Sequence, residues 1–510
     1  MGSIPELNQA VWNSEEALIS FSGLSQNYHA DVAIIGAGIT GLSTAYQLAK
    51  AGKKVVVLEQ FQVGKGTTGS STGNLYIPID ERLSSIESKH DVDTLKKVVQ
   101  SRQAAIRFIE QRVLEFGLDC DYKKVPWHLF TTTSSSSQNS EVIKEKEAAV
   151  KAGLFFREET PVDFPYPDVE ELLTLTDQAQ FNPLKYAQQF AQAIEGENCR
   201  IFENTKVLNV EDGSPCKVFT STGLVTADKV VIATHSPKGI YGVQSAMESY
   251  REFALAAKIK GDLPAPGVYW HVQPGSQFSV RPYTNKSDNY LLVLGAPFKV
   301  GSKNNQKYLD LVRSYLNVYF EVEEIQYEWA AQNYKPADHL PFIGKSHLEK
   351  NTYIATGFSA DGLVYGTLAG MLIGDEILER KNEWGTVYLP TRFTPGASAL
   401  KFAKENLSVA GHLVKDYLFY GEVDELKEIK AGEGKNIKLE GERLAAYRDE
   451  LGKLHIVSGI CTHLGCVVHF NPVEKSWDCP CHGSRFSTEG KVLEGPAFTD
   501  LAKPGEGEAK

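Results

Sequence analysis

The chain has 510 residues, of which 42% are hydrophobic and 23% are charged, and this length predicts more than one globular domain at about 150 residues for each. No apolar run approaches the roughly 18 consecutive residues that a membrane helix needs, so a membrane-spanning protein is excluded. The net charge of −11 argues against a nucleic-acid-binding protein, which usually presents a basic face.

Residues 31–60 predict a strand, a helix and a second strand. Residues 31–35 and 54–58 are short apolar runs typical of buried strands, and the apolar residues of 42–49 recur at helical spacing. The turn between the first strand and the helix reads Gly36-Ala-Gly38-Ile-Thr-Gly41. In such a turn the first glycine allows a tight bend, the second lets the backbone approach a pyrophosphate, and the third lets helix and strand pack closely.

Glu59 ends the second strand. A carboxylate there can hydrogen-bond both ribose hydroxyls of an adenosine diphosphate that lacks a 2′-phosphate, and the amides at the start of the helix attract its phosphates. The strand, helix and acid together predict a bound dinucleotide, and this motif alone leaves NAD and FAD both open.

The rest of the chain predicts a mixture of helices and strands. We expect a polar loop at residues 67–74 and an exposed loop at the serine run 134–137. Helices are expected at 93–116, 185–194 and 363–379, strands at 125–133, 207–210, 229–233 and 353–357, and a strand pair at 282–294 around a turn at 285–288. Beyond Val414 the sequence changes to short strands, charges and glycines, which predicts a domain boundary.

Several segments are similar to the D-amino-acid-oxidase-like family of FAD enzymes. They read DVAIIGAGITGLSTAYQLAKAGKKVVVLEQ (31–60), GTTGSSTGN (66–74), WAAQNYKPADHLPFIG (329–344) and ATGFSADGLVYGTLAG (355–370). The resemblance covers roughly residues 31–392 and implies that the dinucleotide is FAD.

The resemblance also implies which residues bind FAD. They are Gly36, Gly38, Ile39, Thr40, Gly41, Glu59, Gln60, Gly66, Thr67, Thr68, Thr72, Gly73, Asn74, Val207, Ala233, Thr234, Gly357, Gly362 and Leu363. The helix that starts near Leu363 is expected to direct its positive end at the flavin edge that gains negative charge on reduction. Some members attach FAD through cysteine or histidine, but no cysteine stands between Cys216 and Cys461, and serine or threonine stands in the early loop. We therefore expect non-covalent FAD.

Two short motifs near the C-terminal end predict a metal centre. Residues 461–466 read CTHLGC and residues 479–484 read CPCHGS, so that each motif supplies a cysteine and a histidine. Four such ligands can hold tetrahedral zinc, but zinc fingers pair two cysteines and then two histidines. One cysteine and one histidine from each half suit a [2Fe–2S] cluster with two thiolates on one iron and two imidazoles on the other. The expected ligands are Cys461, His463, Cys479 and His482.

The two motifs resemble the Rieske family, in particular its cytochrome bc and b6f type. That resemblance implies a disulfide between Cys466 and Cys481, and an electron-transfer domain instead of an oxygenase component. It also implies that Ser484 donates to a bridging sulfide. Phe486 stands where high-potential relatives carry tyrosine, which predicts a lower potential than theirs.

The expected fold is an α/β FAD-binding Rossmann-like domain with an α+β substrate domain on a mixed sheet, followed by a small all-β Rieske domain. The expected boundaries are 31–85, 180–245 and 335–400 for the FAD-binding domain, 86–179 and 246–334 for the substrate domain, and 405–505 for the Rieske domain. In the last domain we expect His455 and His469 to be surface strand residues and not ligands.

The two cofactors together predict a redox enzyme. A flavin takes two electrons from a C–H bond next to nitrogen or oxygen, whereas a Rieske cluster carries one. The resemblance to the D-amino-acid-oxidase-like family implies that the substrate is a small amine or amino acid. We expect its electrons to pass from flavin through the cluster to an external acceptor, which is a protein, a quinone-like molecule or oxygen. A single dinucleotide fingerprint argues against NADH as the donor.

The substrate site is less well defined by the sequence. Arg281 and Tyr283 are candidates for binding a substrate carboxylate, since arginine can bind it with two parallel hydrogen bonds. Candidates for lining the flavin face are His235, Tyr334, His339 and Tyr365. No acid–base residue is assigned.

Two alternative functions stay open. One is an oxidase that uses oxygen, with an ancillary cluster. The other is a non-enzymatic redox sensor or partner protein that docks through the charged segment 422–438, although a solvated loop is the favoured interpretation of this segment. Residues 1–30 lack a basic start and an apolar core of a signal peptide, so a cytoplasmic location is expected, with no nucleic acid as partner.

Overall fold

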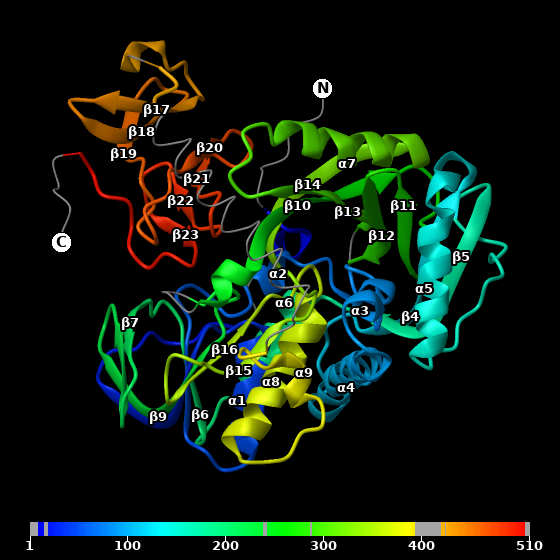
Figure 1. Ribbon diagram of the computed structural model, residues 1–510, viewed down its shortest axis with the longest axis horizontal. Helices are drawn as coiled ribbons and strands as arrows, with labels where there is room; N and C mark the ends of the chain where they lie inside the picture. Colours follow the sequence, from blue (N-terminus) through cyan, green and yellow to red (C-terminus); the bar gives the residue numbers. More distant parts are fainter. Residues whose placement is uncertain are drawn as a thin grey trace.

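The computed structural model describes residues 9–14, 19–237, 242–285, 288–392, 420–423 and 425–504. Two eight-stranded sheets with their helices form the larger part of the molecule, and two small sheets form a C-terminal lobe, which is orange and red in Figure 1. In the part of the chain that is described, no helix has the length and hydrophobicity required to cross a bilayer.

The first large sheet has a parallel centre. Its strands are β1 (Tyr28–Ile35), β2 (Val55–Leu58), β6 (Cys199–Phe202), β7 (Val207–Glu211), β8 (Cys216–Thr220), β9 (Leu224–Ile232), β15 (Phe342–Lys345) and β16 (Thr352–Thr356). The main path runs β15-β16-β9-β1-β2-β6, and β7 and β8 extend it from β9. Val32 of β1 lies opposite both Val55 of β2 and Lys229 of β9, in parallel register. Since β2 is fully buried, it reads as a continuous apolar run.

Helices cover this sheet. They are α1 (Ile39–Lys50), α4 (Val92–Phe116), α6 (Pro183–Ile194) and α8 (Gly362–Ile377). Asn182 caps α6, since its Oδ1 accepts hydrogen bonds from the amides of Leu184 and Lys185 at 3.2 and 3.1 Å. Helix α8 packs on α1 and α4 (Figure 1). The start of α8 thereby comes close to the start of α1.

The second large sheet is mixed. Its strands are β3 (Asn74–Leu75), β4 (Lys123–Thr132), β5 (Val169–Gln180), β10 (Met247–Ile259), β11 (Val268–Gln273), β12 (Ser276–Thr284), β13 (Asn289–Lys299) and β14 (Val322–Pro336). Their order is β14-β10-β13-β12-β11-β4-β5-β3, with β4 and β11 parallel and the other neighbours antiparallel. The helices α3 (Leu83–Lys89), α5 (Asn139–Lys151) and α7 (Gln306–Tyr319) lie around it (Figure 1).

Where the structure describes it, the C-terminal lobe contains short strands and one helical turn. Its three-stranded sheet comprises β17 (Gly434–Leu439), β18 (Glu442–Arg448) and β19 (Leu454–Ser458), and its four-stranded sheet comprises β20 (His469–Asn471), β21 (Ser476–Asp478), β22 (Arg485–Ser487) and β23 (Val492–Glu494). The lobe lies against β10 and β14 of the second large sheet (Figure 1). The remaining short helices among the described residues are η1 (Val11–Ser14), α2 (Thr67–Ser70), η2 (Thr133–Gln138), η3 (Val243–Ala246), α9 (Gly385–Tyr388) and η4 (Leu426–Glu428).

The predicted fold class is confirmed, with two local differences. The expected loop at residues 67–74 contains α2 and β3, because Asn74 and Leu75 pair with β5 at the edge of the second sheet. The serine run forms η2, since the Thr132 side chain caps it. The predicted boundary at Val414 lies outside the described residues, and the exact domain boundaries stay a prediction.

Candidate active site

The glycine-rich turn joins β1 to α1. A Cβ atom on Gly41 would collide with the carbonyl group of Gly36, so glycine at this position lets α1 lie close to the strand. Gly38 is the N-cap of α1 and offers no side chain, so the backbone at the positive end of the helix borders the cavity beside it. This geometry fits the diphosphate of a dinucleotide.

Glu59 fixes the turn and borders the same cavity. Its Oε2 accepts a hydrogen bond from the amide of Ala37 at 2.9 Å, and its Oε1 accepts one from the amide of Phe61 at 2.9 Å. A carboxylate oxygen can accept more than one hydrogen bond, so a ribose hydroxyl can donate to Glu59 as well. The predicted role of Glu59 is therefore compatible with its position.

We call this space the cofactor cavity. It has a volume of about 380 Å³. The predicted FAD-binding residues that line it are Gly36, Gly38, Ile39, Thr40, Glu59, Gln60, Gly66, Thr67, Thr68, Thr72, Val207, Ala233, Thr234, Gly362 and Leu363. Gly41, Gly73, Asn74 and Gly357 are not among its lining residues. Gly362 and Leu363 begin α8, so the positive start of a second helix also borders the cavity. This helix start would stabilise the negative charge on a reduced flavin.

Two of the predicted substrate-site residues, His235 and Tyr334, line the cofactor cavity. Their ring centroids are 5.0 Å apart, and His235 Nδ1 lies 3.2 Å from Thr67 Oγ1 in the predicted flavin loop. Burial lowers the pKa of His235 to about 4, so its imidazole is neutral at pH 7.

The other candidates lie away from the lining of both cavities described here. The Arg281 guanidinium donates to the carbonyl groups of Thr72 and Gly73 at 2.8 and 3.0 Å, so it supports the predicted flavin loop and does not face a substrate carboxylate. Burial lowers the pKa of Arg281 to about 9. Tyr283 packs on Trp12 instead.

Tyr365 and His339 also have structural contacts. The Arg102 guanidinium lies 4.5 Å from the centroid of the fully buried Tyr365 ring. His339 Nε2 lies 3.7 Å from Glu81. Their assignment to the flavin face therefore gains no support from the structure.

A second cavity, which we call the acidic cavity, adjoins the first and measures about 660 Å³. Its lining includes the charged residues Asp80, Glu81, Arg82, Glu141, Lys144, Glu252, Lys335 and Asp361. The two cavities share six lining residues, which are Ser71, Thr72, Glu252, Leu294, Ala360 and Leu363. Sequence reasoning missed this cavity because its residues come from distant segments. The sequence feature that could have indicated the cavity is Glu252, an acidic residue directly before the apolar residues 253–257.

Several charges of the acidic cavity are paired. Lys335 Nζ lies 2.8 Å from Asp80 and 2.8 Å from Glu81. Asp361 accepts a hydrogen bond from the buried Arg102 at 3.1 Å. Burial nevertheless raises the pKa of Asp361 to about 6, although the charge of Arg102 opposes the shift.

The four predicted cluster ligands come together in the C-terminal lobe. Cys461 and Cys479 are buried thiols, and a hydrogen bond between their sulfur atoms lowers the pKa of Cys461 to about 7. The His463 and His482 ring centroids are 5.1 Å apart. His482 Nδ1 is buried and has no hydrogen-bond partner among the described residues, which fits an atom that binds a metal. Two thiols beside two imidazoles suit a Rieske cluster.

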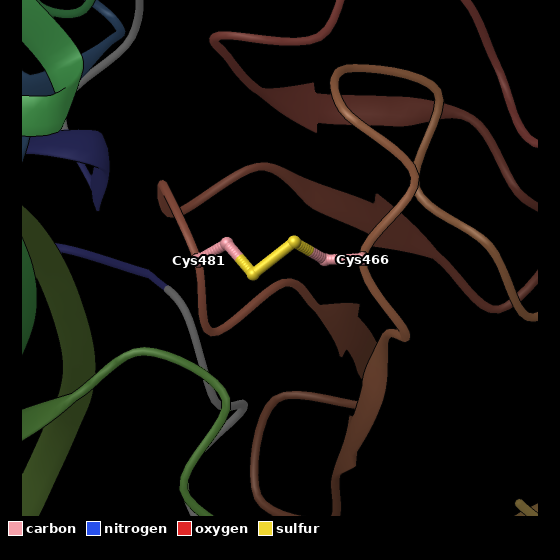
Figure 2. The surroundings of a disulfide bond; sticks show 2 residues. All are labelled: Cys466 and Cys481. Atoms are coloured by element: carbon pink, nitrogen blue, oxygen red, sulfur yellow. A yellow bond between two sulfur atoms is a disulfide. The ribbon is translucent and has the colours of Figure 1, made fainter. Parts of the chain in front are cut away.

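A disulfide between Cys466 and Cys481 joins the two ligand-bearing loops, as Figure 2 shows. The S–S distance is 2.06 Å and the Cα–Cα distance is 6.5 Å. The Sγ atoms of Cys466, Cys479 and Cys481 all lie within 4.8 Å of one another, so the disulfide is next to a predicted ligand. The predicted pairing is thus present in the structure.

Buried residues surround the cluster loops. The Ser484 hydroxyl accepts a hydrogen bond from the amide of Ala497 at 3.1 Å and also bonds the thiol of Cys461, and Phe486 is fully buried. His469 lies on strand β20 as expected, but its predicted surface position was wrong, because it is buried with Nδ1 2.8 Å from the Gly301 carbonyl oxygen of the larger part of the molecule. His455 is half-buried on β19 beside Asp449.

A short chain of hydrogen bonds links the cluster loops to the cofactor cavity. Gln332 Nε2 donates to the Gly483 carbonyl oxygen at 2.8 Å and to the Tyr334 hydroxyl at 2.6 Å. That hydroxyl donates to the Gly495 carbonyl oxygen at 3.1 Å. Gly495 and its neighbour Glu494 also line the cofactor cavity. The C-terminal lobe therefore forms one wall of this cavity.

Buried ion pairs fix the lobe in this position. Arg251 of β10, which is 1% exposed, lies 2.5 Å from Glu474 and 2.8 Å from Glu494. Arg485 lies 3.0 Å from Glu474 and 2.9 Å from Asp478. Burial opposes ionisation of Glu494, but Arg251 and Arg485 hold its pKa at about 2.

Comparison with known proteins agrees with both parts of the site. Residues 31–376 match the FAD dependent oxidoreductase family (DAO), and residues 420–504 match the Rieske [2Fe-2S] domain. The chain is 33% identical over 504 residues to a protein of Bacillus subtilis (strain 168) that is named as a Rieske 2Fe-2S iron-sulfur protein, YhfW, with 97% of each chain covered.

Two further relatives match the larger part of the chain. It is 25% identical over 419 residues to gamma-glutamylputrescine oxidoreductase of Escherichia coli (strain K12), covering 78% of this chain and 95% of that protein. The crystal structure of glycine oxidase from Geobacillus kaustophilus has a TM-score of 0.58 at 17% identity. The superposition covers 72% of this chain and 100% of the glycine oxidase chain. The latter similarity concerns the fold.

Proposed function

The chain belongs to the DAO family of FAD-dependent oxidoreductases and carries a C-terminal Rieske [2Fe–2S] domain, and from this premise we propose that it oxidises a small amine or amino acid and passes the electrons through the cluster to an external acceptor. It is an enzyme of the amine and amino-acid oxidase type. FAD supplies a two-electron oxidant when bound, and the cluster supplies a one-electron carrier.

The observation that carries the proposal is the wall shared by the two centres. Glu494 and Gly495, which follow the cluster loops, line the cofactor cavity. Gln332 and Tyr334 connect Gly483, next to the expected ligand His482, with that same wall. Electron transfer between the two centres requires them to be close, and the contact of the cluster loops with the cofactor cavity meets this requirement. A cluster without a role in turnover would not require this contact.

The residues of the chain have separate tasks in this proposal. The turn at 36–41 and Glu59 bind the adenosine diphosphate, and the starts of α1 and α8 stabilise negative charge on FAD. The acidic cavity admits the substrate, because it adjoins the cofactor cavity on the side formed by α3, α5 and β11. Gln332 and Tyr334 hold the cluster loops against the cavity.

An anaerobic rapid-mixing experiment with a panel of amines, amino acids and hydroxy acids tests the proposal. We expect a substrate to bleach the flavin first and to produce the reduced-cluster EPR signal afterwards. Cys461→Ser removes an expected ligand and should abolish reduction of the acceptor while sparing flavin bleaching. Cys216→Ser, at a buried thiol on β8, is the matched control and should leave both steps unchanged.

Two results would contradict the proposed electron path. Reduction of the cluster without prior reduction of the flavin would reverse the order. Stoichiometric peroxide, formed at the same rate in Cys461→Ser and in the wild type, would instead identify an oxygen-using oxidase with an ancillary cluster.

A further inference from the structure

The junction of the two cavities contains one ionisable side chain. Of the six residues that line both cavities, Glu252 alone carries a titratable group. It lies on β10 opposite Ala331 of β14 and is 6% exposed. A substrate held in the acidic cavity meets the cofactor cavity at this carboxyl group.

The charge of Glu252 is not balanced by an ion pair. The neighbouring acids have cationic partners, since Lys335 pairs with Asp80 and Glu81, and Arg102 pairs with Asp361. Within the described ranges, no cationic group lies within 4.0 Å of the Glu252 carboxylate, which bonds the Asn333 side chain. A buried carboxylate of this kind costs free energy that a cationic ligand would offset.

We propose that Glu252 binds the ammonium group of an amine substrate at the junction and accepts one proton from it. This assignment rests on the proposed function and names its substrate class as a cationic amine. An N–H bond of the ammonium group breaks and an O–H bond forms on Glu252, so that a cation and a carboxylate become a neutral amine and a carboxylic acid. No electrons move in this step. The later loss of a C–H bond with its electron pair is chemistry that FAD would supply when bound.

The surroundings of Glu252 suit a proton acceptor. Burial raises its pKa to about 7, with a further contribution from the charge of Asp80. The charged groups that face it are Asp80 and Glu81 of the loop before α3, which raise the pKa, and Lys335 of β14, which lowers it. An alkylammonium group has a pKa of about 10, so it needs a base to become neutral at physiological pH. A base with a pKa near the working pH is the most effective one.

The kinetic test compares Glu252→Gln with the wild type. Flavin reduction by the best amine of the panel is measured anaerobically between pH 6 and pH 10. In the wild type we expect the rate constant to rise through about pH 7 and then level off, because the carboxylate is the reactive form. In Glu252→Gln we expect a loss of roughly 100-fold at pH 7.5, and a rate that rises up to the amine's own pKa of about 10.

Two further variants make the comparison specific. Glu248→Gln removes a carboxylate of the same strand that pairs with Lys299 and does not line either cavity, and it should behave as the wild type. Glu252→Asp keeps a carboxylate and should keep the rise near pH 7. If Glu252→Gln fails to retain FAD, the pH profile of Glu252→Asp becomes the deciding measurement. A rate constant of flavin reduction in Glu252→Asp that does not rise near pH 7 would then overturn the assignment.

A binding measurement is independent of turnover. Tert-butylammonium has no hydrogen on the carbon next to nitrogen, so it cannot be oxidised. Titration calorimetry should show that it binds the wild type and Glu248→Gln equally, and that it binds Glu252→Gln at least about tenfold more weakly, since a hydrogen bond between charged groups is lost.

The outcomes separate this inference from the proposed function. Equal rates, equal pH profiles and equal tert-butylammonium affinity in Glu252→Gln and the wild type overturn the role of Glu252, while amine oxidation stands. If no amine bleaches the flavin of the wild type, the proposed function is overturned and the proton transfer with it.

Discussion

The side-chain amide of Gln332 donates a hydrogen bond to the carbonyl oxygen of Gly483 at 2.8 Å. Gln332 belongs to β14 of the second large sheet, and Gly483 directly follows His482 in the cluster loop. The same amide also reaches Tyr334, which lines the cofactor cavity. One buried side chain thus connects the surroundings of both redox centres.

Replacing Gln332 by leucine should slow electron transfer between the two centres. The substitution leaves the Gly483 carbonyl without its partner and removes the contact to Tyr334. The lost hydrogen bond is worth about 1.4 kcal/mol. If the barrier to electron transfer rises by the same amount, reduction of the cluster becomes about tenfold slower. Stopped-flow absorbance with freeze-quench EPR measures both steps. Flavin bleaching should be unchanged, and Gln326→Leu, elsewhere on β14, should alter neither step.

Replacing Arg251 by methionine should loosen the C-terminal lobe. Among the described residues, Arg485 is then the cation that remains paired with both Glu474 and Glu494. Removing one partner of a buried ion pair costs about 3–5 kcal/mol, measured as the free energy of unfolding in urea. Lys258→Met on the same strand breaks a more exposed pair with Asp288 and should cost less than about 1 kcal/mol. Limited proteolysis should cleave only the Arg251 variant faster. Equal cleavage would show that the ion pairs do not hold the lobe.

Replacing Cys466 by serine should weaken the cluster loops. The disulfide closes a loop with a sequence separation of 15, and a cross-link of this span contributes about 3 kcal/mol. We expect the visible absorbance of the cluster to disappear at a lower temperature, whereas flavin release should change little. A reductant should shift the wild type in the same direction and leave Cys466→Ser unaffected. A variant that loses its cluster no earlier than the wild type would contradict this.

A tyrosine in place of Phe486 should raise the potential of the cluster. Phe486 is fully buried in the cluster domain, and a hydroxyl group there can add a hydrogen bond that stabilises the reduced form. A bond worth about 1.4 kcal/mol corresponds to about 60 mV for one electron. A redox titration followed by EPR measures the shift. Phe470→Tyr, at a half-buried ring on β20, serves as the control.

His128 should make stability depend on pH below neutrality. Burial lowers its pKa to about 4, so between pH 6.5 and pH 4 the unfolded chain binds the proton that the folded chain excludes. Its contribution is complete above pH 6.5 and falls as the pH drops, by about 2 kcal/mol at pH 5. Glu252 and Asp361 have raised pKa values and act in the opposite sense. The test is therefore the difference between the wild type and His128→Gln. Urea unfolding at pH 7.5 and pH 5 should show a smaller loss of stability in the variant, and equal losses would refute this role.

Local patterns predicted much of the fold and both cofactors. The turn at 36–41 and the motifs around Cys461 and Cys479 are short, and their chemistry depends on residues close together in sequence. Their spacing therefore predicts a dinucleotide and a metal cluster, whereas FAD as the dinucleotide is implied by the resemblance of the longer segments to a known family. The same holds for α4 and α6, whose apolar periodicity is regular.

The substrate cavity could not be predicted in this way. Arg281 is a candidate carboxylate ligand from the sequence because arginine can bind a carboxylate with two parallel hydrogen bonds, but its guanidinium donates to the carbonyl groups of Thr72 and Gly73. Only the folded chain brings Asp80, Glu252 and Asp361 to one cavity. His469 was misplaced for a similar reason, since its burial arises from packing against Gly301 and not from its own strand.

The cofactor cavity lies between two walls of different origin. One adjoins the acidic cavity through Glu252 and Leu363, and the other contains Glu494 and Gly495 of the cluster lobe. In the proposed electron path the acceptor takes its electrons at the cluster lobe, whereas the substrate enters on the side of the acidic cavity. The two reactants then do not exclude one another, so steady-state kinetics should show no competition between them, and a slowly released product would still permit reoxidation.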